Sequence, residues 1–234
     1  MTTRFARIAA LSLGLFAAIG AEAAMACAGR PTVWDISLGA AVSDLPTGFG
    51  DYACGSNGGP PGRPLQGFGD YLQCNPDQRG WHEVYFRYDD EEEFVARALE
   101  QQRRIAMCEG TQVFGIPVVA SVLLDEGGTV QGIRIVSDPR GTEPAQRDDH
   151  WALGNMLRRH FPGDWECSPL ALGPGSTPVG SFQPDQECVL SADGVEMTIR
   201  QHYHHRIGQA FVDDFDVVQP GLFVSDAYFE MIRK

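Results

Sequence analysis

The chain has 234 residues, of which 43% are hydrophobic and 21% charged, and its formal net charge is −13. This composition is typical of a folded protein, because a disordered chain carries fewer apolar residues. The acidity argues against nucleic-acid binding, which needs clustered Lys and Arg to displace the counterions of the phosphate backbone. The 27 glycines and 15 prolines predict a loop-rich protein rather than a helical bundle.

The first 26 residues have the layout of a secretory signal peptide. Arg4 and Arg7 precede an apolar run over residues 8–19, and small residues follow it as far as Ala28. A basic start, a short apolar centre and a small-residue cleavage site are typical of exported proteins. The run is too short to cross a bilayer, which takes about 20 apolar residues. We predict cleavage after Ala26, which leaves a periplasmic or secreted chain of net charge −14 without a transmembrane segment.

An even number of cysteines in an exported chain predicts disulfides, three in this protein. The six cysteines are Cys27, Cys54, Cys74, Cys108, Cys167 and Cys188. Local spacing favours pairing Cys167 with Cys188 and then Cys54 with Cys74, which leaves Cys27 for Cys108, but the sequence does not select one connectivity. A lipid anchor on Cys27 is an alternative, although Ala24 stands where a lipoprotein signal usually has Leu. A zinc–thiolate site is disfavoured, because the chain has no C-x-x-C motif.

The predicted elements mix short strands with two main helices. In chain order they are a short helix (39–45), a Gly- and Pro-rich loop (46–69), a strand (81–88), a helix (90–107), two strands (112–124 and 129–136), a helix (144–161), a second Gly- and Pro-rich loop (168–184), strands (188–190, 195–205 and 210–218) and a C-terminal helix (225–233).

Two turn signals predict antiparallel hairpins. Residues 125–128 and 192–194 carry Asp and Gly between apolar runs. Pro117 should place its strand at an edge or a bulge, because proline cannot donate to a ladder. We therefore predict an α+β fold with antiparallel sheets, two main helices and long loops, stapled by disulfides. Residues 27–234 form a single compact domain in this reading, either undivided or with two sub-halves at 27–110 and 111–234.

The candidate metal ligands are His202 and His204. Because side chains alternate along a strand, these two imidazoles share one face, and two such imidazoles can bind one metal ion. Asp213 and Asp216 follow the strand and could add carboxylates. Two arginines flank the histidines and would repel a divalent cation, so a solvated polar strand face is the competing interpretation.

The sequence contains neither G-x-S-x-G nor H-E-x-x-H, two motifs of hydrolytic catalysis. We therefore predict a non-catalytic binding or accessory protein of the bacterial envelope that needs no cofactor. Its partner would be a protein or a small molecule, contacted by the two Gly- and Pro-rich loops. The alternative is an exported metal-dependent hydrolase or metal-binding protein that uses His202 and His204.

Overall fold

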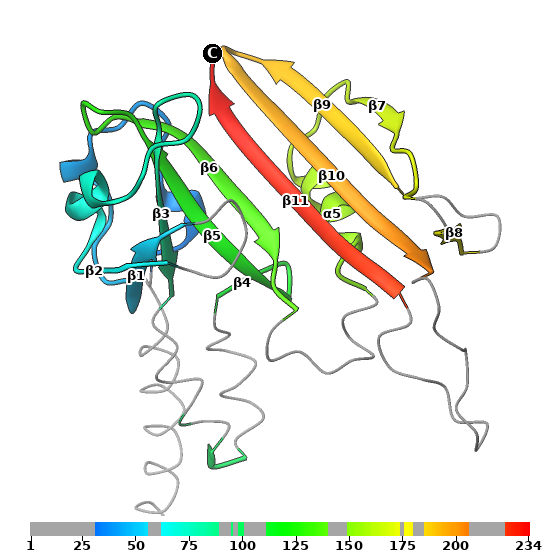
Figure 1. The fold of residues 1–234 in the computed structure, drawn as a ribbon, viewed down its shortest axis with the longest axis horizontal. Helices are drawn as coiled ribbons and strands as arrows, with labels where there is room; N and C mark the ends of the chain where they lie inside the picture. The colour runs from blue at the N-terminus through cyan, green and yellow to red at the C-terminus, as the bar shows by residue number, and fades with distance from the viewer. Residues whose placement is uncertain are drawn as a thin grey trace, which may run out of the picture.

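The computed structural model describes residues 31–55, 62–88, 95, 98–100, 111–139, 149–173, 176–179, 185–205 and 223–234. Its dominant feature is an eleven-stranded antiparallel sheet in the order β2-β1-β3-β5-β6-β11-β10-β9-β7, with β4 beside β5 and β8 beside β10 (Figure 1). The strands are β1 (Asp51–Cys54), β2 (Pro64–Leu65), β3 (His82–Arg87), β4 (Gln112–Val113), β5 (Ile116–Leu124), β6 (Val130–Ser137), β7 (Glu166–Pro169), β8 (Thr177–Pro178), β9 (Gln186–Ala192), β10 (Val195–His205) and β11 (Phe223–Arg233).

The helical elements of the described residues are few and mostly short. They are the α-helix α5 (Ala152–His160) and the 3-10 helices η1 (Val33–Asp35), η2 (Val42–Asp44) and η3 (Phe68–Gln73). The short helix predicted over 39–45 is thus reduced to η2. None of the described helices is long and apolar enough to span a bilayer.

One face of the sheet forms the hydrophobic core. Residues directly opposite each other on neighbouring strands point to the same face. One such row crosses five central strands and is fully buried: Phe86, Ala120, Ile135, Phe229 and Ile199. The opposite face of these strands carries most of the charged side chains that the sheet contributes, and it holds the candidate site.

Helix α5 packs on the apolar face of β10 and β11. Leu153 and Leu157 lie one turn apart and are fully buried, which stabilises the helix by about 1.5–3 kcal/mol per side chain. At the end of the helix, the ring of Phe161 stacks on Phe229 with 5.6 Å between the ring centroids. The helix predicted over 144–161 is therefore confirmed in its second half.

Both predicted hairpins are confirmed. β5 and β6 pair around the 125–128 turn, and β9 and β10 pair around Asp193 and Gly194. Both of these turn residues have positive φ, as a type I′ turn requires. This tight turn fixes the register of the β9–β10 pair, with Gln186 opposite Gln201.

The C-terminal helix predicted over 225–233 is wrong, because this segment is the strand β11. It lies between β6 and β10 and joins the two parts of the sheet (Figure 1). Its side chains alternate: Ala227 and Phe229 are buried in the core, and Asp226, Tyr228 and Glu230 lie on the other face. This period of two suits a strand, and β11 has a partner along each side that satisfies its backbone.

The edge position predicted for Pro117 is also wrong. β5 is an inner strand between β3 and β6. Pro117 is its second residue and pairs only with Gln112 of β4, before the ladders to β3 and β6 begin. Its missing N–H is therefore not needed by either long ladder.

The two predicted loops contain strands. β1 and β2 lie within residues 46–69, and the end of β7 and all of β8 lie within 168–184. The structure forms the disulfides Cys54–Cys74 and Cys167–Cys188. Outside the described residues lie the predicted signal peptide, Cys27, Cys108, the strand over 210–218 and most of the helix over 90–107.

Candidate metal centre

Three strands bring the candidate ligands together on the polar face of the sheet. His202 lies on β10 directly opposite Asp226 of β11. On its other side, the β9–β10 register continues to Asp185, the residue just before β9. His204 follows two residues after His202 and points to the same face. The result is a cluster of two imidazoles and two carboxylates, defined here as the His–Asp cluster: Asp185, His202, His204 and Asp226.

Three of these side chains already lie at ligand spacing. Nδ1 of His204 is 2.8 Å from Oδ1 of Asp185, and Nδ1 of His202 is 3.3 Å from the same oxygen. One ligand atom from each of the three residues lies within 4.8 Å of the other two. Zinc–ligand bonds of about 2.0–2.1 Å in a tetrahedron place the ligand atoms about 3.3 Å apart. The two imidazole–carboxylate separations therefore come within about half an ångström of the tetrahedral value.

Asp185 is the most enclosed member of this group, with its side chain only 4% exposed. When the Asp185 carboxylate is ionised it can only accept hydrogen bonds, and in that state both imidazoles present an Nδ1–H to it. Metal binding would replace these two protons with the ion, because histidine coordinates through a deprotonated nitrogen. The same geometry thus serves either as a hydrogen-bonded triad or as three metal ligands.

Asp226 adds a second carboxylate to an already acidic cluster. Burial raises the pKa of Asp226, and the Asp185 carboxylate adds to the increase, while His202 and His204 act in the opposite direction. If both aspartates are ionised and both imidazoles are neutral, the cluster carries two negative charges. A divalent cation would balance this charge.

The repulsion expected from Arg200, one of the two flanking arginines, is reduced by local pairing, whereas the other, Arg206, lies outside the described residues. Arg200 lies on the same face of β10, but its Nε donates to Glu187 and its guanidinium lies over the ring of Tyr228. Asp213 and Asp216, the carboxylates proposed from the sequence, lie outside the described residues. Asp185 and Asp226 supply the carboxylates that the structure places at the histidines.

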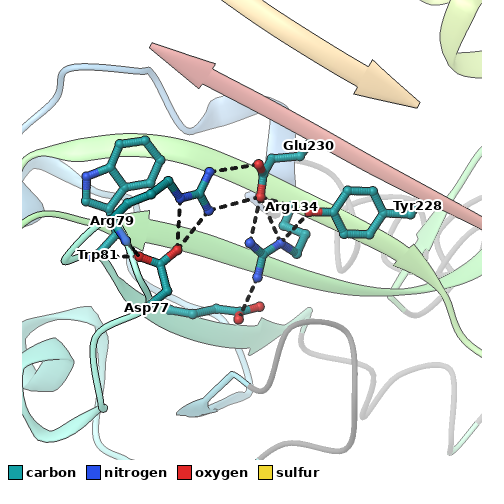
Figure 2. Close-up of polar contacts among 7 residues, drawn as sticks. Asp77, Arg79, Trp81, Arg134, Tyr228 and Glu230 are labelled. Carbon is teal, nitrogen blue, oxygen red and sulfur yellow. Dashed lines mark hydrogen bonds and ion pairs between the residues drawn. The ribbon is translucent and has the colours of Figure 1, made fainter. Parts of the chain in front are cut away.

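A second polar group occupies the same face, farther along β11 (Figure 2). Arg134 of β6 is its centre: Nη2 binds Glu230 at 2.6 Å, Nη1 binds Glu83 at 2.7 Å, and Nε donates to the hydroxyl of Tyr228 at 3.0 Å. Arg79 extends it by binding Glu230 at 2.9 Å. The side chain of Arg134 is 6% exposed.

The outer part of this group is a loop that closes on the sheet. Arg79 also pairs with Asp77, and its guanidinium lies 4.2 Å from the ring centroid of Trp81 (Figure 2). We call the set Asp77, Arg79, Glu83, Arg134, Tyr228 and Glu230 the arginine network. It contains two cations and three carboxylates, so its charges nearly balance.

The pairing changes the acidity of the network side chains. Burial by itself would raise the pKa of Glu230, but hydrogen bonds from Arg79 and Arg134 outweigh burial and hold this pKa below its ordinary value. Burial raises the pKa of Tyr228 to about 12, with Arg134 opposing the increase. The network therefore keeps Glu230 ionised and Tyr228 protonated over a wide pH range.

No protein-family model matches this chain, and the searches of curated proteins and of solved structures likewise give no match. The interpretation of the His–Asp cluster therefore depends on its geometry and charge.

Proposed function

We propose that this protein binds a divalent transition-metal ion at the His–Asp cluster, with Zn²⁺ as the first ion to test. The observation that carries the proposal is the convergence of Asp185, His202 and His204 within 4.8 Å on two paired chain segments. Imidazole and carboxylate are ordinary zinc ligands. Two ionised carboxylates would match the charge of the ion.

We further propose that the role is binding rather than catalysis. Asp226 stands opposite His202 on β11 and is the residue that we propose as the fourth ligand, added to the three that already converge. Closed four-ligand shells are typical of structural zinc sites. A hydrolytic site would keep one position open for water.

The setting that we propose is the envelope or the exterior of a bacterial cell, where the ion would support contact with a protein or small-molecule partner. Two disulfides indicate maturation in an oxidising compartment. Export itself is inferred from the signal-like residues 1–26.

The test is metal analysis of the mature chain, expressed without a histidine tag and dialysed against buffered zinc. We expect one tightly held zinc ion per chain, and Asp185→Asn or His204→Ala should weaken binding at least about tenfold, since loss of even an outer-shell partner typically costs that much. His160→Ala is the matched control, because His160 is an exposed histidine on α5 outside the cluster. A wild-type chain that retains no zinc, or equal losses in all three variants, would overturn the proposal.

A further inference from the structure

The two disulfides of the structure lie in different surroundings. Cys54–Cys74 joins β1 to the end of η3, and Cys74 is buried in the hydrophobic core. Cys167–Cys188 links β7, the edge strand of the sheet, to β9. Every residue of β7 is exposed, whereas Cys188 is completely buried. The second bridge therefore has one accessible end and one enclosed end.

A guanidinium lies against both sulfur atoms of the second bridge. Nη1 of Arg158 is 3.4 Å from Sγ of Cys167 and 3.6 Å from Sγ of Cys188. The other terminal nitrogen of Arg158 donates to Oδ1 of Asn155, one turn earlier on α5, which fixes the guanidinium in place. Among the described residues, no cation makes such a contact with the sulfurs of Cys54 and Cys74.

The accessible end of the bridge opens into a hollow of about 740 Å³. Asn155, Arg158, Trp165 and Cys167 line it. Asp164 and Glu166 line it as well, but neither forms an ion pair with Arg158 in the described part of the chain. The guanidinium charge is thus directed at the sulfur atoms rather than neutralised by a carboxylate.

We propose that Cys167–Cys188 is an exchangeable disulfide that reacts with thiols entering this hollow. A thiolate attacks Sγ of Cys167 and forms a new sulfur–sulfur bond to it. The Cys167–Cys188 bond breaks, and its electron pair leaves on Sγ of Cys188 as a thiolate beside Arg158. A second thiol then resolves the mixed disulfide, so that two external thiols are oxidised to a disulfide and the protein bridge is reduced by two electrons.

Arg158 accelerates this exchange by stabilising the leaving group. A neighbouring cation lowers the pKa of a thiol, and a leaving thiolate of lower pKa departs faster. Without the guanidinium, a thiolate at the buried Cys188 position would be poorly solvated and uncompensated. The proposal is independent of the His–Asp cluster.

The test follows both bridges in the same molecule. The mature chain is exposed briefly to dithiothreitol, free thiols are alkylated, and peptide mass spectrometry measures the opening rate of each bridge. We expect Cys167–Cys188 to open at least about tenfold faster than Cys54–Cys74, since exposure and leaving-group acidity both favour it. Glutathione in place of dithiothreitol should be found attached to Cys167 and not to Cys188. Equal opening rates, or glutathione on Cys188, would overturn the proposal.

Arginine variants test the role of the charge. Arg158→Met should slow opening of Cys167–Cys188 about threefold, which corresponds to about one unit in leaving-group pKa. Arg158→Lys should restore most of the rate, and Arg159→Met, which changes the adjacent arginine of the same hollow, should match the wild type. Dividing the opening rate of Cys167–Cys188 by that of Cys54–Cys74 corrects for a general loosening of the fold. An unchanged ratio in Arg158→Met, or an equal change in Arg159→Met, contradicts the assignment.

Discussion

The His–Asp cluster and the arginine network occupy the same face of β11, but their carboxylate charges are compensated in different ways. Asp226 belongs to the cluster, and Tyr228 and Glu230, the next residues on that face, belong to the network. In the network, arginines from β6 and from the loop before β3 offset buried carboxylates. In the described part of the chain, the cluster contains carboxylates and imidazoles but no arginine or lysine.

This difference shows what each group requires. Removing a charge from water costs several kcal/mol unless a partner compensates it. The network is compensated from within the chain, and its consequence is structural, because it ties β3, β6 and β11 to the loop that carries Arg79. The cluster lacks internal compensation, so protons or an external cation must supply it. The following predictions test this contrast, beginning with the largest expected effect.

Removing the central cation of the network should have the largest effect. Arg134→Met leaves Glu83 and Glu230 buried without their main counterion, and breaking a buried ion pair in this way costs about 3–5 kcal/mol. Arg200→Met, which breaks a half-exposed pair with Glu187, should cost less than about 1 kcal/mol. Urea unfolding measures both values. Similar losses in the two variants would contradict the structural role of the network.

Zinc should stabilise the protein through the cluster alone. At a zinc concentration about 100 times the Kd, binding to the native state should raise the free energy of unfolding by about 2.7 kcal/mol. Asp185→Asn, with binding at least about tenfold weaker, should reduce this increase to about 1.4 kcal/mol or less, whereas Arg134→Met should keep it despite its lower starting stability. Thermal unfolding with and without zinc gives the comparison. A zinc effect that disappears equally in both variants would mean that the two groups are not separate.

Acid should weaken the network through Glu230. The pKa of Glu230 is lowered in the folded protein, so its contribution is present above the unfolded pKa of about 4.3 and is lost as the pH falls through the lower folded value. Glu230→Gln should therefore lose less stability than the wild type between about pH 5 and pH 2. Glu196→Gln, beside Lys234 at the surface, is the control. An acid profile for Glu230→Gln equal to that of the wild type would refute this account.

The smallest effect should come from Tyr228→Phe. The hydroxyl of Tyr228 accepts from Arg134 and donates to Glu230, and its removal should cost about 1 kcal/mol near neutral pH. The folded pKa is raised to about 12, so the contribution is complete below the unfolded value of about 10 and is lost as the pH rises through about 12. The variant should consequently lose less stability above pH 10, as alkaline urea titrations would reveal. If Tyr228→Phe lost as much stability above pH 10 as the wild type, that result would argue against the network hydrogen bonds.

Part of the candidate site was predictable from local sequence rules. Alternation placed His202 and His204 on one face, and the type I′ turn at Asp193 and Gly194 fixed the hairpin. His202 lies seven residues after the first residue of β10, and Asp185 lies seven residues before the last residue of β9. Counting outward from the turn would thus have identified Asp185 from the sequence.

Asp226 and the arginine network could not be identified by counting residues from a turn. Asp226 reaches His202 only because β11 inserts between β6 and β10, and the chain segment over 225–233 was predicted as a helix. Arg134 lies within the strand predicted over 129–136, where nothing in the local sequence marks it as the centre of a charge network. Its partners Glu83 and Glu230 lie 51 and 96 residues away in the sequence, so no local pattern links them.

The sequence by itself determined the hairpins, which are set by their turns, and the end of α5 near Pro162. It also favoured disulfides between the cysteines closest in the chain, without selecting them. These features depend on interactions among neighbouring residues, where φ preferences and side-chain periodicity dominate. The tertiary structure alone decided the position of β11, and with it which charges meet. Strand pairing between distant segments is selected by the burial of a whole face, and this free energy belongs to the complete sheet rather than to any one segment.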